Sequence, residues 1–142
     1  MGKLLINLLV IVSLALSGTA LAATAESYYN NGVEFVKARQ YDRAIVEFTK
    51  ALEINPGIAN AYALRSLCYG ARGQSDRAIA DSTKALEINP RLALAYENRA
   101  IGYFAKKRFD KAWDDVHKAQ SLGYNINRKF LQNLRKASRR QN

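Results

Sequence analysis

An eight-residue segment occurs twice in this chain, and its recurrence limits the possible folds more than any other feature. The sequence Thr-Lys-Ala-Leu-Glu-Ile-Asn-Pro at 49–56 returns letter for letter at 83–90, 34 positions later. The same spacing relates 42–45 to 76–79. Two sets of single residues share it as well: Tyr28, Tyr62 and Tyr96, and Ala44, Ala78 and Ala112. A fixed period of this length is typical of a chain built from stacked structural units.

The period divides the chain into three units, at 25–58, 59–92 and 93–126. Each unit has two stretches whose apolar residues recur every three or four positions, as on one face of an α-helix. Short polar breaks separate the two stretches of a unit. Pro56 and Pro90 end the second stretches, because a helix seldom continues through the residue before a proline. We therefore expect an all-α fold, an α-solenoid of three helix-turn-helix repeats.

The first residues are expected to direct export. Lys3 provides a short basic start, an apolar stretch follows at 4–16, and 20–22 has the small-x-small pattern of a cleavage site. We therefore interpret 1–22 as a signal peptide and expect the protein to be periplasmic or secreted. The alternative is an uncleaved anchor, because 4–23 is uncharged and long enough to span a bilayer. Under both interpretations Lys3 keeps the N-terminus in the cytoplasm and the repeats outside it.

A family resemblance rests on residues that recur in the first half of each unit. They are an aromatic residue, a small residue four positions later and a second aromatic residue three further on: Tyr28, Gly32 and Phe35; Tyr62, Ser66 and Tyr69; Tyr96, Ala100 and Tyr103. Completed by a small alanine, a bulky residue and a terminal proline, this pattern resembles the tetratricopeptide repeat, a 34-residue helix-turn-helix unit. The first two units are identical at 15 of 34 aligned positions, although Ser82 replaces the expected bulky residue. The third unit departs further, at Trp113, Val116 and 123–124, as expected of a terminal repeat.

The resemblance implies that the first helices of the repeats form a concave groove that holds a peptide segment of a partner protein. Carried over position by position, the groove of this chain comprises Tyr29, Asn30, Val33, Val36, Leu64, Leu67, Ala71, Leu94, Glu97, Asn98, Ile101 and Phe104. Most of these residues are apolar, which favours recognition of hydrophobic anchors by shape. Asn30 and Asn98 are expected to be available to hydrogen-bond a peptide backbone. The alternative is that the apolar residues only support helix packing.

Some relatives in this family clamp the C-terminal carboxylate of heat-shock chaperones with Lys, Asn and Arg side chains. The matching positions of this chain hold Tyr29, Val33, Leu64, Leu94 and Asn98. Since the required cations are missing from these positions, the chain is not expected to have that activity.

The repeats at 23–124 are followed by a tail, 125–142, that we expect to form a seventh, capping helix. Asn127 is a plausible N-cap residue for this helix, since its side-chain oxygen can accept from a backbone N–H of the first turn. An apolar stripe on the same segment is suited to cover the last repeat: Ile126, Phe130, Leu131 and Leu134.

The other face of the tail is basic. Residues 25–124 hold 15 Lys or Arg against 12 Asp or Glu, whereas 125–142 holds no acid and six cations: Arg128, Lys129, Arg135, Lys136, Arg139 and Arg140. One interpretation is a solvated exterior, which a terminal repeat needs. The other is a patch for an anionic lipid surface, where a basic amphipathic helix gains both burial and counter-charge. Export argues against nucleic acid as a partner.

Few residues could carry catalysis or hold a cofactor. His117 is the single histidine, without a second His or Cys at metal-ligand spacing. Cys68 is the single cysteine and lies among apolar residues, where a thiol is usually a small filler. Asp114 and Asp115 would point about 100° apart on a helix and cannot share a proton. We therefore expect no enzyme, no cofactor and no metal site.

The leading functional prediction is an exported adaptor that binds a peptide segment and assists assembly of an envelope complex. The first alternative is a module held to anionic membrane by its basic tail. The second is a homo-oligomeric structural protein, since only two residues, 23–24, would precede the first repeat after cleavage and leave its outer face without a cap.

Overall fold

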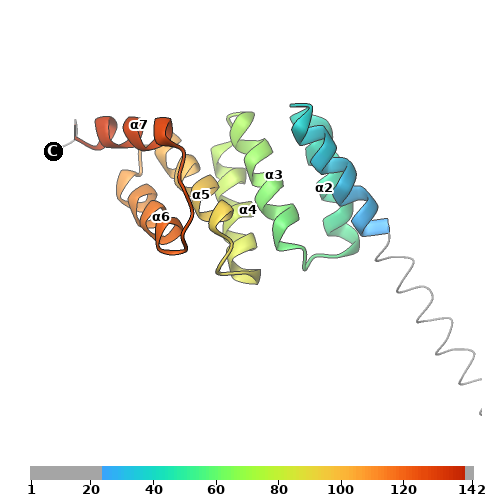
Figure 1. Ribbon diagram of the computed structural model, residues 1–142. Coiled ribbons are helices and arrows are strands. Elements are labelled where there is room, and N and C mark those ends of the chain that lie inside the picture. The colour runs from blue at the N-terminus through green and yellow to red at the C-terminus, as the bar shows by residue number, and fades with distance from the viewer. Residues whose placement is uncertain (1–23, 140–142) are drawn as a thin grey trace, which may run out of the picture.

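The computed structural model describes residues 24–139, which form a stack of α-helices without any strand in that range (Figure 1). The predicted signal peptide, 1–22, and Arg140 lie outside the described residues. A first helix covers residues 24–37. It is followed by α2 (Tyr41–Ile54), α3 (Ala59–Ala71), α4 (Ser75–Ile88), α5 (Ala93–Ala105), α6 (Phe109–Ser121) and α7 (Arg128–Ser138).

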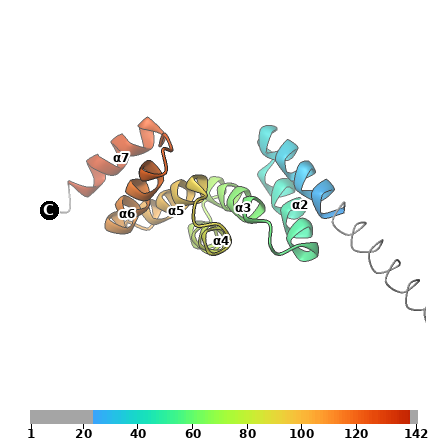
Figure 2. The same ribbon diagram turned by 60° about the horizontal axis from the view of Figure 1, so that its bottom comes forward.

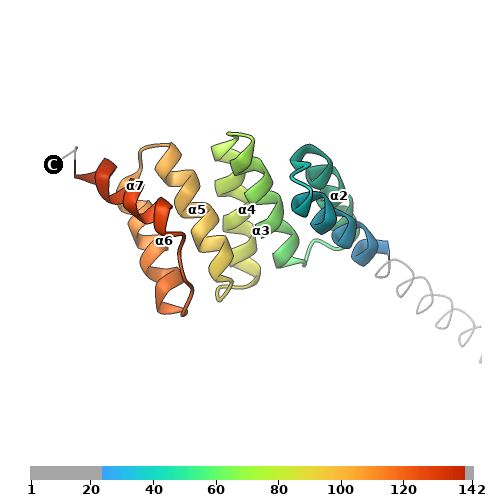
Figure 3. The same ribbon diagram turned by 45° about the horizontal axis from the view of Figure 1, so that its top comes forward.

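The helices form antiparallel pairs that stack side by side. Helix α3 packs on α4 within its own repeat, and it also contacts α2 of the preceding repeat and α5 of the following one. The contact between α3 and α5 places the first helices of successive repeats next to each other on one face (Figure 3). Figure 2 shows the resulting curvature, with the first helix and α7 at the two ends of an arc. The predicted all-α solenoid with three helix-turn-helix repeats and a capping helix is confirmed.

Within each repeat, the two helices meet at a pair of residues 16 positions apart whose sizes compensate. In the first repeat Phe48 is fully buried, and a Cβ atom added at Gly32 would lie 2.6 Å from its ring. In the third repeat the pair is Ala100 and Val116, which belong to one buried cluster. A large residue on one helix is thus matched by a smaller one on the other, as close packing of the interior requires.

The second repeat uses a hydrogen-bonded pair at the same place. Ser66 and Ser82 are both fully buried, with their hydroxyl oxygens 2.6 Å apart. Ser66 Oγ also donates to the carbonyl oxygen of Ala78, 2.9 Å away. Buried hydroxyl groups are tolerated when they are paired in this way. Ser82, a departure from the family pattern, is therefore accommodated by a polar partner on the facing helix.

The turns inside the repeats adopt a left-handed backbone conformation at equivalent positions. These positions are Arg39 (φ 57°), Gly73 (φ 73°) and Lys107 (φ 59°), each 34 residues apart. Only glycine adopts this conformation without a steric penalty. The polar breaks of the sequence therefore mark true chain reversals, which the first and third repeats make with a non-glycine residue.

The C-terminal helix covers the last repeat. The side chain of Asn127 accepts a hydrogen bond from the backbone nitrogen of Phe130 at 3.1 Å, which confirms the predicted N-cap. Leu134 is fully buried, and Phe130 and Ile126 are nearly so. They join Val116 of α6 in one apolar cluster. Because this face of α7 is occupied by the repeat core, only its basic face is left for solvent.

Candidate peptide-binding groove

A depression of about 470 Å³ lies on the face formed by the first helices, between α3, α5 and the start of α7. Its volume is within the range of about 300–1,000 Å³ that is common for ligand sites. Six of the twelve residues predicted for the groove line it: Leu67, Ala71, Leu94, Glu97, Asn98 and Ile101. The remaining lining residues are Ser66, Gly70, Tyr124, Asn127 and Phe130. The depression is therefore made by the second and third repeats together with the C-terminal segment.

The other six predicted residues lie outside this depression. Tyr29, Val33, Val36 and Leu64 are partly buried against the core of the first two repeats. The Tyr29 ring lies 5.8 Å from that of Phe48, and burial raises the pKa of Tyr29. These contacts support helix packing, the alternative that the sequence left open for the apolar residues.

Asn30 and Phe104 complete this set of six. Asn30 is exposed on the first helix. Phe104 packs on two other rings, with centroids 5.8 Å from Phe109 and 5.7 Å from Phe130. Phe104 therefore belongs to the core between α5, α6 and α7.

Part of the Asn98 amide, which was expected to be available to a peptide, is already engaged inside the fold. Asn98 is 7% exposed, and its amide nitrogen donates to the carbonyl oxygen of Ala63 at 2.8 Å. This bond ties α5 to α3 of the preceding repeat. Asn98 lines the depression as predicted. Its amide has a second N–H and a carbonyl oxygen, so a hydrogen bond from Asn98 to a peptide stays a prediction.

Glu97 is likewise engaged inside the fold. It is 8% exposed and accepts hydrogen bonds from the Tyr124 hydroxyl and from the backbone nitrogen of Asn127, both at 2.9 Å. These bonds hold the connection between α6 and α7 against α5. The connection thereby becomes one wall of the depression, a contribution that sequence reasoning missed because Tyr124 and Asn127 were assigned only to the repeat end and the cap.

We expect Tyr124→Phe to destabilise the fold by about 1 kcal/mol, since it removes one hydrogen bond to a buried carboxylate. Burial and the hydrogen bond to Glu97 raise the pKa of Tyr124 to about 12. A folded-state pKa above the unfolded value of about 10 means that this stabilisation is complete below about pH 10 and is lost as the pH rises toward 12. The stability difference between the wild type and Tyr124→Phe, measured by urea unfolding, should therefore stay constant up to about pH 10 and shrink as the pH rises from there toward 12.

Tyr96→Phe is the control for this experiment, since the Tyr96 hydroxyl donates only to an exposed carbonyl oxygen at 3.2 Å. Its effect should be smaller at neutral pH. A difference for Tyr124→Phe that stays constant over the whole pH range would contradict the assigned hydrogen bond.

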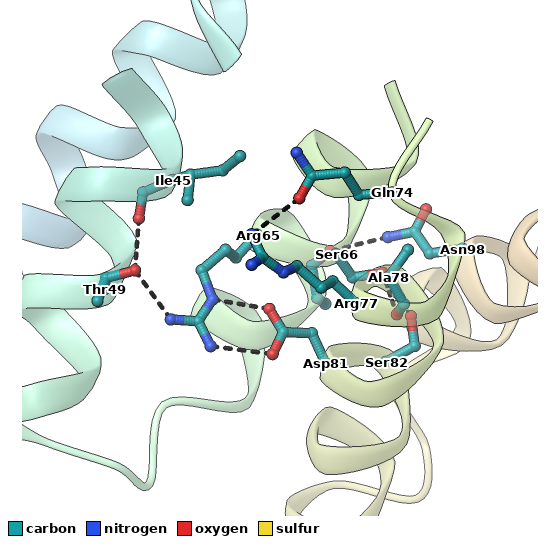
Figure 4. Close-up of polar contacts among 11 residues, drawn as sticks. Ile45, Thr49, Arg65, Ser66, Gln74, Arg77, Ala78, Asp81, Ser82 and Asn98 are labelled. Atoms are coloured by element: carbon teal, nitrogen blue, oxygen red, sulfur yellow. Dashed lines mark hydrogen bonds and ion pairs between the residues drawn. The ribbon is translucent and has the colours of Figure 1, made fainter. Parts of the chain in front are cut away.

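Two arginines that the sequence analysis did not single out connect the repeats. Arg65 of α3 makes a bidentate ion pair with Asp81 of α4, at 2.7 and 2.9 Å, and donates to Thr49 Oγ1 of α2 at 2.9 Å (Figure 4). Arg99 repeats this arrangement with Asp115, at 2.8 and 2.7 Å, and with Thr83 at 3.3 Å. The signal was present in the sequence, because each of the three residue types recurs after 34 positions.

Among residues 24–139 there is no group of three or more His, Cys, Asp or Glu side chains placed to hold a metal ion. Burial raises the pKa of Cys68 to about 11, so its thiol stays protonated at neutral pH. His117 stacks on Trp113, with ring centroids 5.6 Å apart. None of the helices in this part of the chain combines the length and the apolar character needed to cross a bilayer.

Comparisons with known proteins agree with this geometry. Family models described as the tetratricopeptide repeat match residues 25–58 and 47–80. The search of curated proteins found no match to the chain.

Solved structures share the fold over most of the described residues. The first TPR of Spaghetti (RPAP3), bound to the HSP90 peptide SRMEEVD, is 25% identical, with a TM-score of 0.76 over 84% of this chain and 94% of that chain. The TPR2B domain of yeast Sti1, in a complex with pHsp70, is 25% identical, with a TM-score of 0.73 over 83% and 98% of the two chains. MamA is 28% identical, with a TM-score of 0.66 over 72% of this chain and 60% of that chain.

Proposed function

The chain is a tetratricopeptide repeat protein, and from this premise we propose that it is an adaptor that binds a peptide segment of a partner protein in the depression between α3, α5 and α7. The observation that carries the proposal is the depression itself, on the face formed by the first helices. Two structures of the same fold hold chaperone-derived ligands. Such a role requires no catalytic residue.

The lining determines which chemistry the peptide should have. Leu67, Leu94 and Ile101 present apolar atoms, and Ile101 is 37% exposed. The polar side chains of Glu97 and Asn98 are already bonded within the fold. A ligand therefore gains most by inserting an aliphatic or aromatic side chain, which contributes about 1.5–3 kcal/mol when it is fully buried.

This chemistry differs from that of the chaperone peptide in the similar structure, which is acidic as printed, SRMEEVD. The positions where such ligands are clamped in the family hold, in this chain, residues without a positive charge: Tyr29, Val33, Leu64, Leu94 and Asn98. We propose a peptide with apolar anchors, bound by shape rather than by charge.

The location and the pathway are part of the same proposal. The N-terminal segment, with its basic start and apolar stretch, supports action outside the cytoplasm, where an adaptor of this size would assist assembly of an envelope complex. The homo-oligomeric alternative also stays a prediction.

In-cell photo-crosslinking from position 101 tests the proposal. A probe at Ile101 should give a discrete adduct with one partner protein, and Leu67→Glu should abolish it, because a carboxylate would be desolvated against the apolar ligand. Val46→Glu is the matched control, since Val46 is apolar and 51% exposed on α2, away from the depression. No adduct, or equal loss in both variants, would overturn the proposal. An adduct between two copies of the chain would favour the homo-oligomer.

A further inference from the structure

The C-terminal end of the chain has a one-sided charge. No Asp or Glu follows Asp115, whereas seven cations do: Lys118, Arg128, Lys129, Arg135, Lys136, Arg139 and Arg140. Five of them lie on or directly after α7 within the described residues, and all five are exposed. None of these five takes part in an ion pair in the described part of the chain.

The five cations share one side of α7. At about 100° per residue, positions 128, 129, 135, 136 and 139 fall within an arc of about 120°. The centre of this arc lies opposite the side that carries Phe130 and Leu134, the two buried residues of the helix. The basic arc therefore points away from the stack, and nothing in the described chain covers it.

The helix dipole explains only part of this arrangement: it favours Arg135 and Lys136, which stand in the last turn of α7, but not the cations of the first turn. Arg128 and Lys129 stand in the first turn of α7, where the positive end of the helix dipole disfavours cations. The second helices of the repeats have the opposite pattern, with one acid in each first turn: Asp42, Asp76 and Asp110. A polar exterior for a terminal helix could equally use mixed charges. The first turn of α7 therefore has the reversed sign, and an anionic partner would compensate it.

We propose that the basic arc of α7 docks the stack on the surface of a bilayer that contains anionic phospholipids. Charged side chains make the contact, and the helix does not enter the hydrocarbon layer. The apolar face of α7 covers the last repeat, as the sequence predicts, and is not free to enter a membrane, because Phe130 is 9% exposed and Leu134 is fully buried. Binding is thus electrostatic and sensitive to salt.

A lipid surface fits the arc better than nucleic acid does. The exposed residues of the arc include no aromatic side chain, so the stacking on bases that single-stranded nucleic acid binding uses is absent from this face of the helix. A single convex helix face also offers no groove to follow a phosphate backbone. A broad anionic plane requires neither feature. This docking does not depend on the proposed peptide groove.

Vesicle co-sedimentation of residues 24–142 tests the inference, since this fragment keeps every packed helix of the described structure and omits the apolar leader. Binding to phosphatidylcholine vesicles with about 30% phosphatidylglycerol should fall more than tenfold between about 50 and 300 mM salt. Vesicles of phosphatidylcholine alone should bind weakly at both salt concentrations. Salt-insensitive binding, or equal binding to both vesicle types, would overturn the proposal.

Paired variants locate the contact. The double variant Arg135→Gln, Lys136→Gln should weaken binding by more than about tenfold, since each basic residue near an anionic surface contributes roughly fivefold. Lys84→Gln, Arg91→Gln removes the same charge from exposed positions outside α7 and should change binding less than about threefold. Equal losses would indicate an effect of net charge alone and refute docking through α7.

Two further measurements test for loss of folding and for binding to nucleic acid. Both double variants should keep the wild-type melting temperature by circular dichroism, because neither changes a buried contact. The same fragment is also titrated with a short DNA duplex at matched salt. If DNA binds more tightly than the vesicles and loses affinity in the α7 variant, nucleic acid replaces the bilayer as the partner.

Discussion

Gly32→Ala and Phe48→Val are each expected to destabilise the stack, and the double variant is expected to lose less than the sum of the two. A Cβ atom at position 32 would lie 2.6–2.9 Å from three atoms of the Phe48 ring, so the alanine forces the helices apart. Overpacking of this kind costs about 1–3 kcal/mol. Phe48→Val leaves a cavity in place of a fully buried ring, at about 2–4 kcal/mol.

The double variant reproduces the pair that the third repeat already uses, Ala100 with Val116. Urea unfolding of the four proteins gives the coupling energy, which we expect to be favourable by about 0.5–3 kcal/mol. Gly70→Ala is the matched control for the glycine, because a Cβ atom there meets nothing within 4 Å. That helix position should gain up to about 1 kcal/mol from alanine. If Gly32→Ala is equally harmless, the inferred compensation of side-chain sizes between positions 32 and 48 is wrong.

The second large effect is expected at the ion pair between the repeats. Asp81→Ala should destabilise the fold by about 3–5 kcal/mol, because it leaves the largely buried Arg65 guanidinium without its counter-charge. Asp42→Ala is the matched control. The side chains of Asp42 and its partner Arg72 are 72% and 51% exposed, so this substitution should cost about 1 kcal/mol or less.

A rescue experiment separates the charge from the packing. Removing both partners, in Arg65→Met with Asp81→Leu, should recover most of the loss, since a buried pair replaced by apolar residues of similar size is often neutral. Chemical unfolding of the single and double variants measures this. The interpretation fails if Asp81→Ala and Asp42→Ala have equal effects, or if the double variant is less stable than Asp81→Ala.

The fold was predictable because local and long-range signals agree in this sequence. The period of 34 predicts the repeats, the apolar spacing predicts the helices, and Asn127 has the residue type of the N-cap that its bond to Phe130 confirms. The apolar stripe of the tail indicated the side that packs on the last repeat. Helix propensity, capping and apolar spacing are encoded within each helix, so the structure of one repeat predicts that of the next.

The site was only partly predictable, because the availability of each polar side chain depends on which neighbouring group it forms a hydrogen bond with. The family register placed Glu97 and Asn98 on the groove side, and both reach the depression. Their hydrogen bonds to Tyr124, Asn127 and Ala63 are set by the docking of the adjacent repeat and the tail. No period in the sequence encodes that docking. For the same reason the depression is shorter than the predicted groove and omits the first repeat.

The hydrogen bonds from Arg65 and Arg99 to threonines of the preceding repeats also determine how such a chain can change its length. The middle repeat supplies Arg65, which donates to Thr49 of the repeat before it, and Thr83, which accepts from Arg99 of the repeat after it. A duplicated copy of residues 59–92 would carry both halves of this connection. The first repeat has Asn31 and Glu47 at the corresponding places, with a 3.3 Å bond of their own. Gene duplication can therefore lengthen this protein from its middle, whereas a copy added beyond either end would find no matching connector.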